Sequence, residues 1–171
     1  MANDVNQLYV TALRNTHAEE TQGLQQMERQ VERLENYPQY AALLRRHIST
    51  TQGQVQRLEQ ALEAQGETIS ALKETVTGLA GNIGAAVHAL SGDETLKNLY
   101  AGYAYQYHQI AAYKSLIEIA KAAGATAHVS LFEKSLQEET EAANEVERLI
   151  APVTQKYVQL YQSQGTSTAK S

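Results

Sequence analysis

The sequence predicts an all-α protein in which four long helices form one bundle. In four separate stretches, apolar residues recur every three or four positions, which places them on one face of a helix. The chain has 171 residues, of which 43% are apolar, so one domain with a sizeable core is expected. It contains only two prolines, so long helices can run uninterrupted. We expect residues 1–162 to form the bundle, and residues 163–171, which are small and polar, to form a disordered tail.

The first half of the chain is predicted to contain two helices. One is expected from about Asn3 to Glu35, where it ends because a proline follows shortly and disfavours helix in the residue before it. The next is expected from Pro38, a residue suited to the first helical turn, to about Ala64.

Three glycines lie inside predicted helices, at Gly23, Gly53 and Gly102. A glycine in a helix interior costs up to about 1 kcal/mol relative to alanine. We therefore expect another segment of backbone to approach the helix closely at these positions.

The second half is predicted to begin with a long connection. Residues 66–92 keep a helical spacing of apolar residues, but their glycines weaken the helix, so we interpret them as a crossover segment that joins two parallel helices. A third helix follows and ends near Gly124. A fourth is expected from about Ala125 to Tyr161, with a kink at Pro152. Four long helices with a long second connection are typical of a ferritin-like four-helix bundle.

Every predicted helix has a polar break near the middle of its apolar face. If the helices pack antiparallel, these breaks converge on one internal layer. An unpaired polar group in that layer would cost roughly 1–3 kcal/mol, so the helices must supply partners for one another. The candidate members of the layer are Glu20 and Glu139, with Gln54, Gln106, Tyr103, His17 and His47 as neighbours.

Two buried glutamates need either a cation or a proton. Bundles that hold two metal ions use one Glu from each of two helices and Glu-x-x-His from each of the other two. This chain contains no Glu-x-x-His, and its nearest approach, His17-Ala-Glu-Glu20, runs in the reverse order. We therefore expect either one weakly bound iron, manganese or zinc ion, or no metal and a layer of hydrogen bonds. His17 and His47 are interpreted as buried histidines with partners and not as ligands.

Composition excludes several classes of function. The chain has no Cys, which rules out disulfides, zinc sites built on Cys, thiol catalysis and iron–sulfur clusters. Its net charge is −5, whereas a nucleic-acid binder normally carries a basic surface patch. No stretch approaches about 18 consecutive apolar residues, and the N-terminus lacks the features of a signal peptide. A cytoplasmic protein without a membrane span is therefore expected.

A family resemblance is carried by LRNTHAEETQ (13–22), RHISTTQGQVQRLEQ (46–60), YHQIAAYKSLIEIAKAAG (107–124) and SLQEETEAANEV (135–146). In this order and spacing, these segments resemble the YciE/YciF-type ferritin-like stress proteins of bacteria. The resemblance covers most of the chain and implies the ferritin-like fold. It also implies a dimetal carboxylate site in the family, to which Glu20 and Glu139 correspond.

The departures from the family pattern fall on the implied metal ligands. Thr50 stands where the second helix of the family has a Glu, and Gln106 and Gln109 stand where its third helix has Glu residues. A neutral amide oxygen is a weak ligand, so these residues cannot balance the charge of two divalent cations. We therefore expect the dimetal site to be degenerate.

These observations favour a cytoplasmic, stress-associated ferritin-like protein that acts as a structural or binding module and not as an enzyme. The alternative is a dimetal iron or manganese carboxylate oxidoreductase, or a metal-binding or storage protein, of the same fold. A helical protein that coats a surface, as phasins do, is disfavoured because such helices need no matched interior carboxylates. A homodimer is expected because Leu116, Ile119 and Leu160 are apolar but lie off the main stripes. The sequence indicates no other protein partner.

Overall fold

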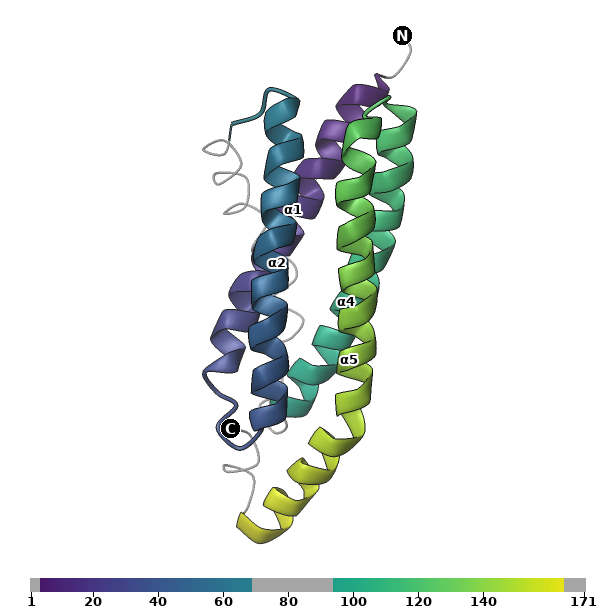
Figure 1. The fold of residues 1–171 in the computed structure, drawn as a ribbon. Helices are drawn as coiled ribbons and strands as arrows, with labels where there is room; N and C mark the ends of the chain where they lie inside the picture. Colours follow the sequence, from purple (N-terminus) through teal and green to yellow (C-terminus); the bar gives the residue numbers. More distant parts are fainter. Residues whose placement is uncertain (1–3, 69–93, 165–171) are drawn as a thin grey trace.

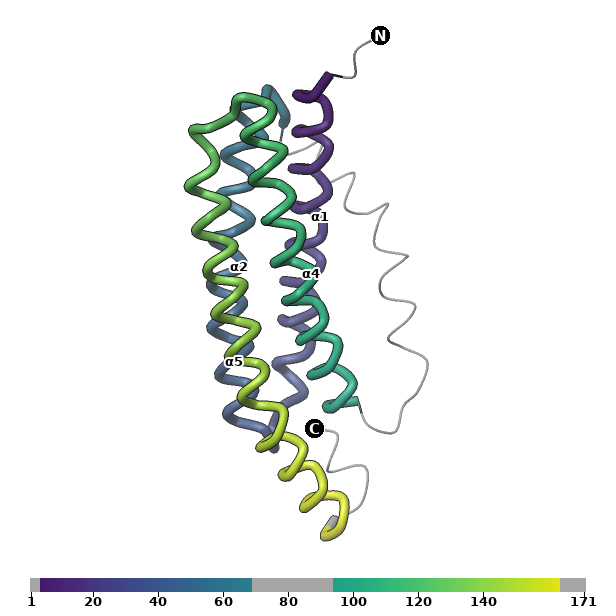
Figure 2. The backbone as a smooth tube through the Cα atoms, turned by 90° about the vertical axis from the view of Figure 1, so that its right-hand side faces the viewer, coloured from purple at the N-terminus to yellow at the C-terminus, as the bar shows by residue number. Residues whose placement is uncertain are grey.

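The computed structural model describes residues 4–68 and 94–164, which form an all-α bundle (Figure 1). Its helices are α1 (Val5–Val31), α2 (Pro38–Ala64), α4 (Glu94–Ala122) and α5 (Thr126–Gln164). α1 with α2, and α4 with α5, form two antiparallel hairpins (Figures 1 and 2). α2 ends and α4 begins at opposite ends of the bundle, so these two helices run in the same direction. The predicted ferritin-like four-helix bundle is thereby confirmed.

The packing order of the helices decides which of them face each other across the bundle. α1 packs against α2 and α4, and α5 packs against the same two helices. α1 and α5 therefore lie diagonally, as do α2 and α4. No described helix is apolar over a stretch long enough to cross a membrane. Most of the predicted crossover (66–92) and of the predicted tail (163–171) lies outside the described residues.

Most helix ends agree with the local signals in the sequence. The Asp4 side chain accepts a hydrogen bond from a backbone N–H of the first turn of α1 (2.9 Å) and so caps this helix. α2 begins at Pro38, as predicted. At the end of α4, Gly124 has a φ of 74°, and the Ala125 N–H donates to the Ala120 carbonyl (2.9 Å). This left-handed glycine is the predicted stop signal.

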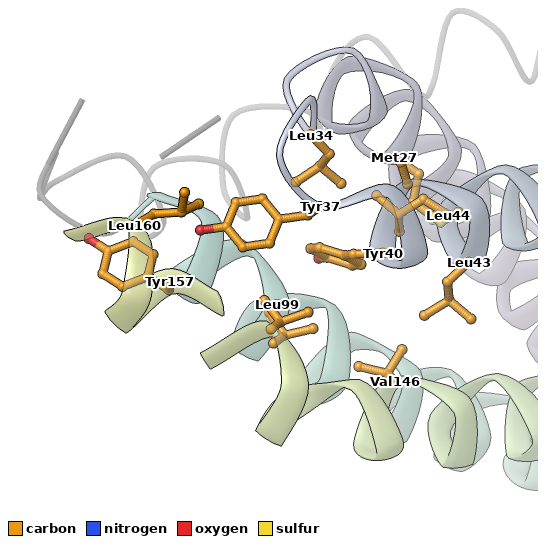
Figure 3. Packing of buried hydrophobic residues seen from close by; sticks show 12 residues of the cluster. Met27, Leu34, Tyr37, Tyr40, Leu43, Leu44, Leu99, Val146, Tyr157 and Leu160 are labelled. Atoms are coloured by element: carbon orange, nitrogen blue, oxygen red, sulfur yellow. The ribbon is translucent and has the colours of Figure 1, made fainter. Parts of the chain in front are cut away.

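The first helix ends earlier than the predicted Glu35. α1 stops at Val31, and in the turns that follow, the Tyr37 N–H donates to the Leu34 carbonyl (3.1 Å). Leu34 and Tyr37 are both buried, and Figure 3 shows them beside the core residues of the adjoining helices. The apolar contacts of these two side chains offset the lost helical turn.

The core consists of two apolar clusters, one toward each end of the bundle. The first includes Met27, Tyr40, Leu44, Leu99, Val146 and Tyr157 (Figure 3). The second includes Tyr9, Leu13, Leu58, Tyr113, Leu116 and Phe132. Both clusters draw on all four described helices. The residues between them along each helix form the polar layer described below.

Pro152 lies inside α5, which continues to Gln164 and so runs past the predicted end at Tyr161. The last part of α5 changes direction (Figures 1 and 2). A proline removes one helical hydrogen bond and clashes with the preceding turn, which accounts for a bend here. Beyond the bend, Tyr157 and Leu160 stay buried and lie close to Tyr37 (Figure 3).

The three apolar residues that motivated a homodimer do not lie at the surface. Leu116 and Leu160 are 1% and 6% exposed, and Ile119 is half-buried. These side chains pack in the core, so that part of the reasoning is wrong. Large apolar side chains are exposed elsewhere among the described residues, at Val5, Leu8, Tyr100, Tyr107, Val158 and Tyr161.

The homodimer itself stays a prediction. Light scattering of the full chain at micromolar concentration should return the mass of two chains, because the exposed apolar side chains leave surface to bury. The mass of a single chain would remove the claim.

Only one of the three helix glycines is required by a close contact. A Cβ atom at Gly23 would lie 2.5 Å from the hydroxyl oxygen of Tyr105 and 2.6 Å from its ring carbon Cζ. Among the described residues, the nearest atom at Gly53 is Nη1 of Arg57 at 3.6 Å, and none lies within 4 Å at Gly102. The expected close approach of another backbone is therefore wrong, since at Gly23 the close neighbour is a side chain.

Candidate functional site

The described helices send buried polar side chains into one layer between the two apolar clusters. Its two glutamates come from diagonal helices, because Glu20 belongs to α1 and Glu139 to α5. They are 0% and 3% exposed, respectively. Their buried polar neighbours are Gln54 from α2, Gln106, Gln109 and Tyr113 from α4, and Ser135 from α5. The structure thus brings Glu20, Glu139, Gln54 and Gln106 together.

Helical spacing explains why these side chains meet. Glu20 follows Leu13 and Thr16 on the buried face of α1 and precedes Gly23 and Met27, all at intervals of three or four residues. Glu139 follows the buried Ser135 in the same way on α5. Because neighbouring helices are antiparallel, positions near the middle of each helix lie at the same level. Polar residues at those positions therefore form one layer.

Glu139 has one hydrogen-bond donor. The Nε2 amide of Gln54 donates to Oε1 of Glu139 (2.6 Å), while Oε2 is buried without a partner among the described residues. Burial, together with the negative charge of Glu20, raises the pKa of Glu139 from 4.5 to about 8, and the hydrogen bond from Gln54 opposes this increase. A carboxyl in these surroundings favours its protonated form near neutral pH.

Glu20 is buried more completely. Burial raises its pKa from 4.5 to about 7, and the hydroxyl of Tyr113 and the amide of Gln109 oppose this increase. Neither group reaches a Glu20 oxygen with the geometry of a full hydrogen bond, so both oxygens lack a partner among the described residues. The positive charge of Arg57, whose guanidinium bonds to Ser135 and Glu138, is the smallest of the effects and lowers the pKa.

The tyrosine beside the layer is Tyr105 and not the predicted Tyr103. The Tyr105 hydroxyl donates to the backbone carbonyl of Glu19 (2.7 Å) and accepts from the Gln109 amide (3.0 Å). The Tyr103 hydroxyl instead contacts that of Tyr107 (3.4 Å) on the exposed side of α4. The prediction of Tyr103 as a member of the layer is therefore corrected. Apolar and aromatic residues are spread over much of the α4 surface, so the sequence pattern did not single out one face.

The two predicted histidines border the layer and are both buried, with 4% and 6% exposure. Nε2 of His17 lies 3.3 Å from Oε1 of Glu59, and Nε2 of His47 lies 3.3 Å from Oε2 of Glu145. Burial lowers the pKa of His47. Each histidine is thus directed to a carboxylate at the rim of the bundle and not to Glu20 or Glu139.

A small cavity adjoins the layer beside Glu139. It has a volume of about 210 Å³ and is lined by Thr50, Thr51, Gln106 and Glu139, among others. Thr50 forms part of its wall. The arginine in its wall, Arg46, pairs with Glu145 (3.3 Å) and so does not neutralise a charge on Glu139.

The residues of the layer do not fit a pair of metal ions. Glu20 and Glu139 carry at most two negative charges, which match one divalent ion, and the amides add none. Within 4–68 and 94–164, no group of three or more His, Cys, Asp or Glu side chains is placed to hold a metal. The unpartnered oxygens of Glu20, Glu139, Gln54, Gln106 and Gln109 form an all-oxygen set that could surround one ion.

Comparison with known proteins gives the family. The family described as "Domain of unknown function (DUF892)" matches residues 4–159, which is most of the chain. The chain belongs to this family. Among solved structures, this DUF892 protein is similar to a protein from Xanthomonas campestris pv. campestris, with 22% identity and a TM-score of 0.77. That match covers 92% of this chain and 99% of the other.

Two further solved structures are similar. The Escherichia coli stress protein YciF has 16% identity and a TM-score of 0.68, over 88% of this chain and 96% of its own. YcfI from Rhodopseudomonas palustris has 21% identity and a TM-score of 0.64, over 86% of this chain and 97% of its own. Together with the DUF892 match, these similarities confirm the resemblance to the YciE/YciF-type proteins. At such identities the individual structures establish the fold and no shared activity.

Proposed function

We propose that this DUF892 protein is a structural or binding module in which a dimetal carboxylate site has degenerated into a layer held by hydrogen bonds and a shared proton. The contact between Gln54 and Glu139 carries the proposal. The amide occupies an oxygen that a bridging carboxylate would give to a metal ion. Because the pKa of Glu139 is raised, this carboxyl favours a bound proton over a metal ion.

Charge balance supports the proposal independently. Two divalent ions between Glu20 and Glu139 would leave a net charge of about two in a buried layer, and burying uncompensated charge is very costly. Thr50, Gln106 and Gln109 stand at the places of family glutamates and contribute no charge. A single proton shared by the two carboxyls leaves one negative charge in the layer, which is smaller than the net charge that two divalent ions would leave.

A metal-dependent oxidoreductase, or a metal-binding or storage protein, of the same fold is the second candidate. One observation favours it, because both oxygens of Glu20 and the amide oxygens of Gln106 and Gln109 lack hydrogen-bond partners among the described residues. Glu20 and Glu139 would hold one iron, manganese or zinc ion. A bound ion of this kind would supply Lewis-acid chemistry or, for iron and manganese, redox chemistry.

The metal content of the purified protein separates the two candidates. We expect far less than one equivalent of iron, manganese or zinc per chain in protein purified without chelator, because Gln54 occupies one oxygen of Glu139 and the raised pKa of Glu139 favours a proton on this carboxyl. Elemental analysis of the parent, of Glu20→Ala and of a control at an exposed glutamate of the same bundle, Glu141→Ala, measures this directly. One or two ions per chain in the parent and in Glu141→Ala, lost in Glu20→Ala, would overturn the proposal.

The proposal includes a cytoplasmic location and a role in stress. The second part is drawn from the name of the Escherichia coli relative, a stress protein of the same fold. A membrane role is not part of the proposal.

A further inference from the structure

Two tyrosines on successive turns of α4 contact each other at the surface of the bundle. The ring centroids of Tyr103 and Tyr107 lie 5.1 Å apart, and the two ring planes meet at 79°. The hydroxyl of Tyr103 is directed to that of Tyr107, with 3.4 Å between the two oxygens. Tyr107 is 50% exposed and Tyr103 is half-buried, so small molecules in solution can reach the pair.

This arrangement resembles the product of oxidative coupling between two phenols. In that product, a carbon–carbon bond joins the ring carbons that lie next to the two hydroxyl groups. The bonded rings are twisted relative to each other, and their hydroxyls lie close together beside the new bond. The contact between Tyr103 and Tyr107 already has the twist and the adjacent hydroxyls. Coupling therefore needs a closer approach of the two ring edges and no reversal of either ring.

The composition of the chain directs one-electron oxidation to tyrosine. Cys and Trp, the side chains that most readily compete with tyrosine for an oxidant, are both absent from the chain. Methionine is oxidised to the sulfoxide, which forms no cross-link. One of the two methionines, Met27, is buried in the core. A radical formed on a tyrosine of this chain thus has no thiol or indole to which it can pass.

The other tyrosines are less suited to coupling. Five of them are buried: Tyr9, Tyr37, Tyr40, Tyr113 and Tyr157. Tyr105 is held by two hydrogen bonds beside the carboxylate layer. The rings of Tyr157 and Tyr161 lie 6.4 Å apart but are nearly parallel, at 17°, so they turn their faces and not their edges toward each other. Among the described residues, Tyr103 and Tyr107 are the tyrosine pair that is both accessible and suitably oriented.

We propose that Tyr103 and Tyr107 form an oxidative cross-linking site, at which hydrogen peroxide and a one-electron oxidant of the peroxidase class join the two rings into dityrosine. Each tyrosine loses one electron and its phenolic proton, and the two radicals form the carbon–carbon bond. The hydrogen on each newly bonded carbon then moves to the oxygen of its ring, which restores both phenols. Together the two tyrosines lose two hydrogen atoms, and these reduce one hydrogen peroxide to two water molecules.

The cross-link would join residues four positions apart on one face of α4 and so would fix the helical turn between them. That turn carries Tyr105 and Gln106, which border the carboxylate layer. The site goes beyond the proposed function and does not depend on it, because neither coupled ring belongs to the layer. A proton or a metal ion on Glu20 and Glu139 leaves the contact between the two rings unchanged.

The experiment exposes the full chain to hydrogen peroxide and a haem peroxidase, with chelator present so that free metal ions generate no oxidant. Trypsin then releases the peptide 98–114, which contains both tyrosines. We expect this peptide to lose the mass of two hydrogen atoms, and its fragmentation to place the link between Tyr103 and Tyr107. The fluorescence of dityrosine should appear in the band of a single chain on a denaturing gel.

Substitution by phenylalanine keeps each ring but removes the hydroxyl that the radical requires. Tyr103→Phe and Tyr107→Phe should therefore each lose the cross-link. Tyr100→Phe is the matched control, because Tyr100 is an exposed tyrosine of the same helix, and this variant should keep the link. Circular dichroism confirms that each variant is folded.

The folded geometry is tested by oxidising the parent in urea, where the preference for this pair should disappear. A folded parent that forms no link between Tyr103 and Tyr107 would overturn the inference. So would a link that forms only between two chains, a link within the peptide that persists in Tyr107→Phe, or an equal yield of the link in urea.

Discussion

Glu139→Gln is expected to raise the free energy of unfolding near pH 8 by on the order of 3 kcal/mol and to flatten its dependence on pH. Burial and the charge of Glu20 raise the pKa of Glu139 from 4.5 to about 8 in the folded state. Between these two pH values, folding takes up a proton. A glutamine is neutral at every pH, and its amide oxygen can still accept the hydrogen bond from Gln54.

The sign of this pH dependence is the reverse of that for a glutamate in a salt bridge. Below pH 4.5 the carboxyl of Glu139 is protonated in both the folded and the unfolded chain, so it causes no penalty. As the pH rises toward about 8, the unfolded chain releases the proton and the folded chain retains it. The free energy of unfolding therefore falls over this range. Glu20, whose pKa is raised to about 7, adds a contribution of the same sign.

Urea unfolding between pH 5 and pH 8 measures this difference. The parent and Glu139→Gln should have similar stability near pH 5 and diverge toward pH 8, while Glu141→Gln at an exposed position should follow the parent. His47 has the opposite effect, because its lowered pKa makes the folded state gain stability as the pH rises toward 6.5. The comparison of variant with parent cancels that contribution. A Glu139→Gln protein less stable than the parent near pH 8 would contradict the account.

The second large effect is expected at Gly23. Gly23→Ala should lower the free energy of unfolding by about 2–3 kcal/mol, because the new methyl group would overlap the ring of Tyr105. That ring cannot move freely, since its hydroxyl bonds to the Glu19 carbonyl and to the Gln109 amide. Displacing it would break hydrogen bonds beside the carboxylate layer as well as strain the packing of α1 against α4.

Gly102→Ala is the matched control on the opposing helix. The same substitution meets no atom of the described residues within 4 Å there, so the gain in helix propensity should raise the free energy of unfolding by about 0.5–1 kcal/mol. Thermal melts of the two variants at one pH test the pair. Equal effects at both positions would show that the Tyr105 ring does not restrict Gly23.

The extent to which the sequence predicts this fold depends on local signals. Pro38 and Gly124 fix helix ends through backbone restrictions of their own, so these ends were predictable. The end of α1 was not, because it depends on Leu34 and Tyr37 finding contacts with residues far along the chain. Leu116 and Leu160 were predicted to be surface residues because they lie off the main apolar stripes of their helices. Each of these helices packs against two others, so more than one stripe of residues is buried.

In the candidate site, too, features set by local sequence were predictable and features set by distant contacts were not. Glu20 and Glu139 were predictable as layer residues because each is a charged residue in the middle of an apolar helix face, which directs it into the core. Tyr105 was missed because apolar and aromatic residues are spread over much of α4, so a stripe through Tyr103 fits its sequence as well as one through Tyr105. The rim partners of the histidines, Glu59 and Glu145, come from other helices. Their identity depends on how the hairpins pack, which no local pattern encodes.

The most direct test of the central claim, that hydrogen bonds and a proton hold the layer, is a thermal melt with and without a chelator. The parent and Glu20→Gln are melted at pH 6 and pH 8. The account predicts that the chelator leaves the melting temperature of the parent unchanged. It also predicts that Glu20→Gln melts at the same temperature as the parent or higher at pH 8. A large decrease in the melting temperature of the parent when chelator is added, together with a Glu20→Gln variant that melts below the parent, would show that a metal ion holds the layer.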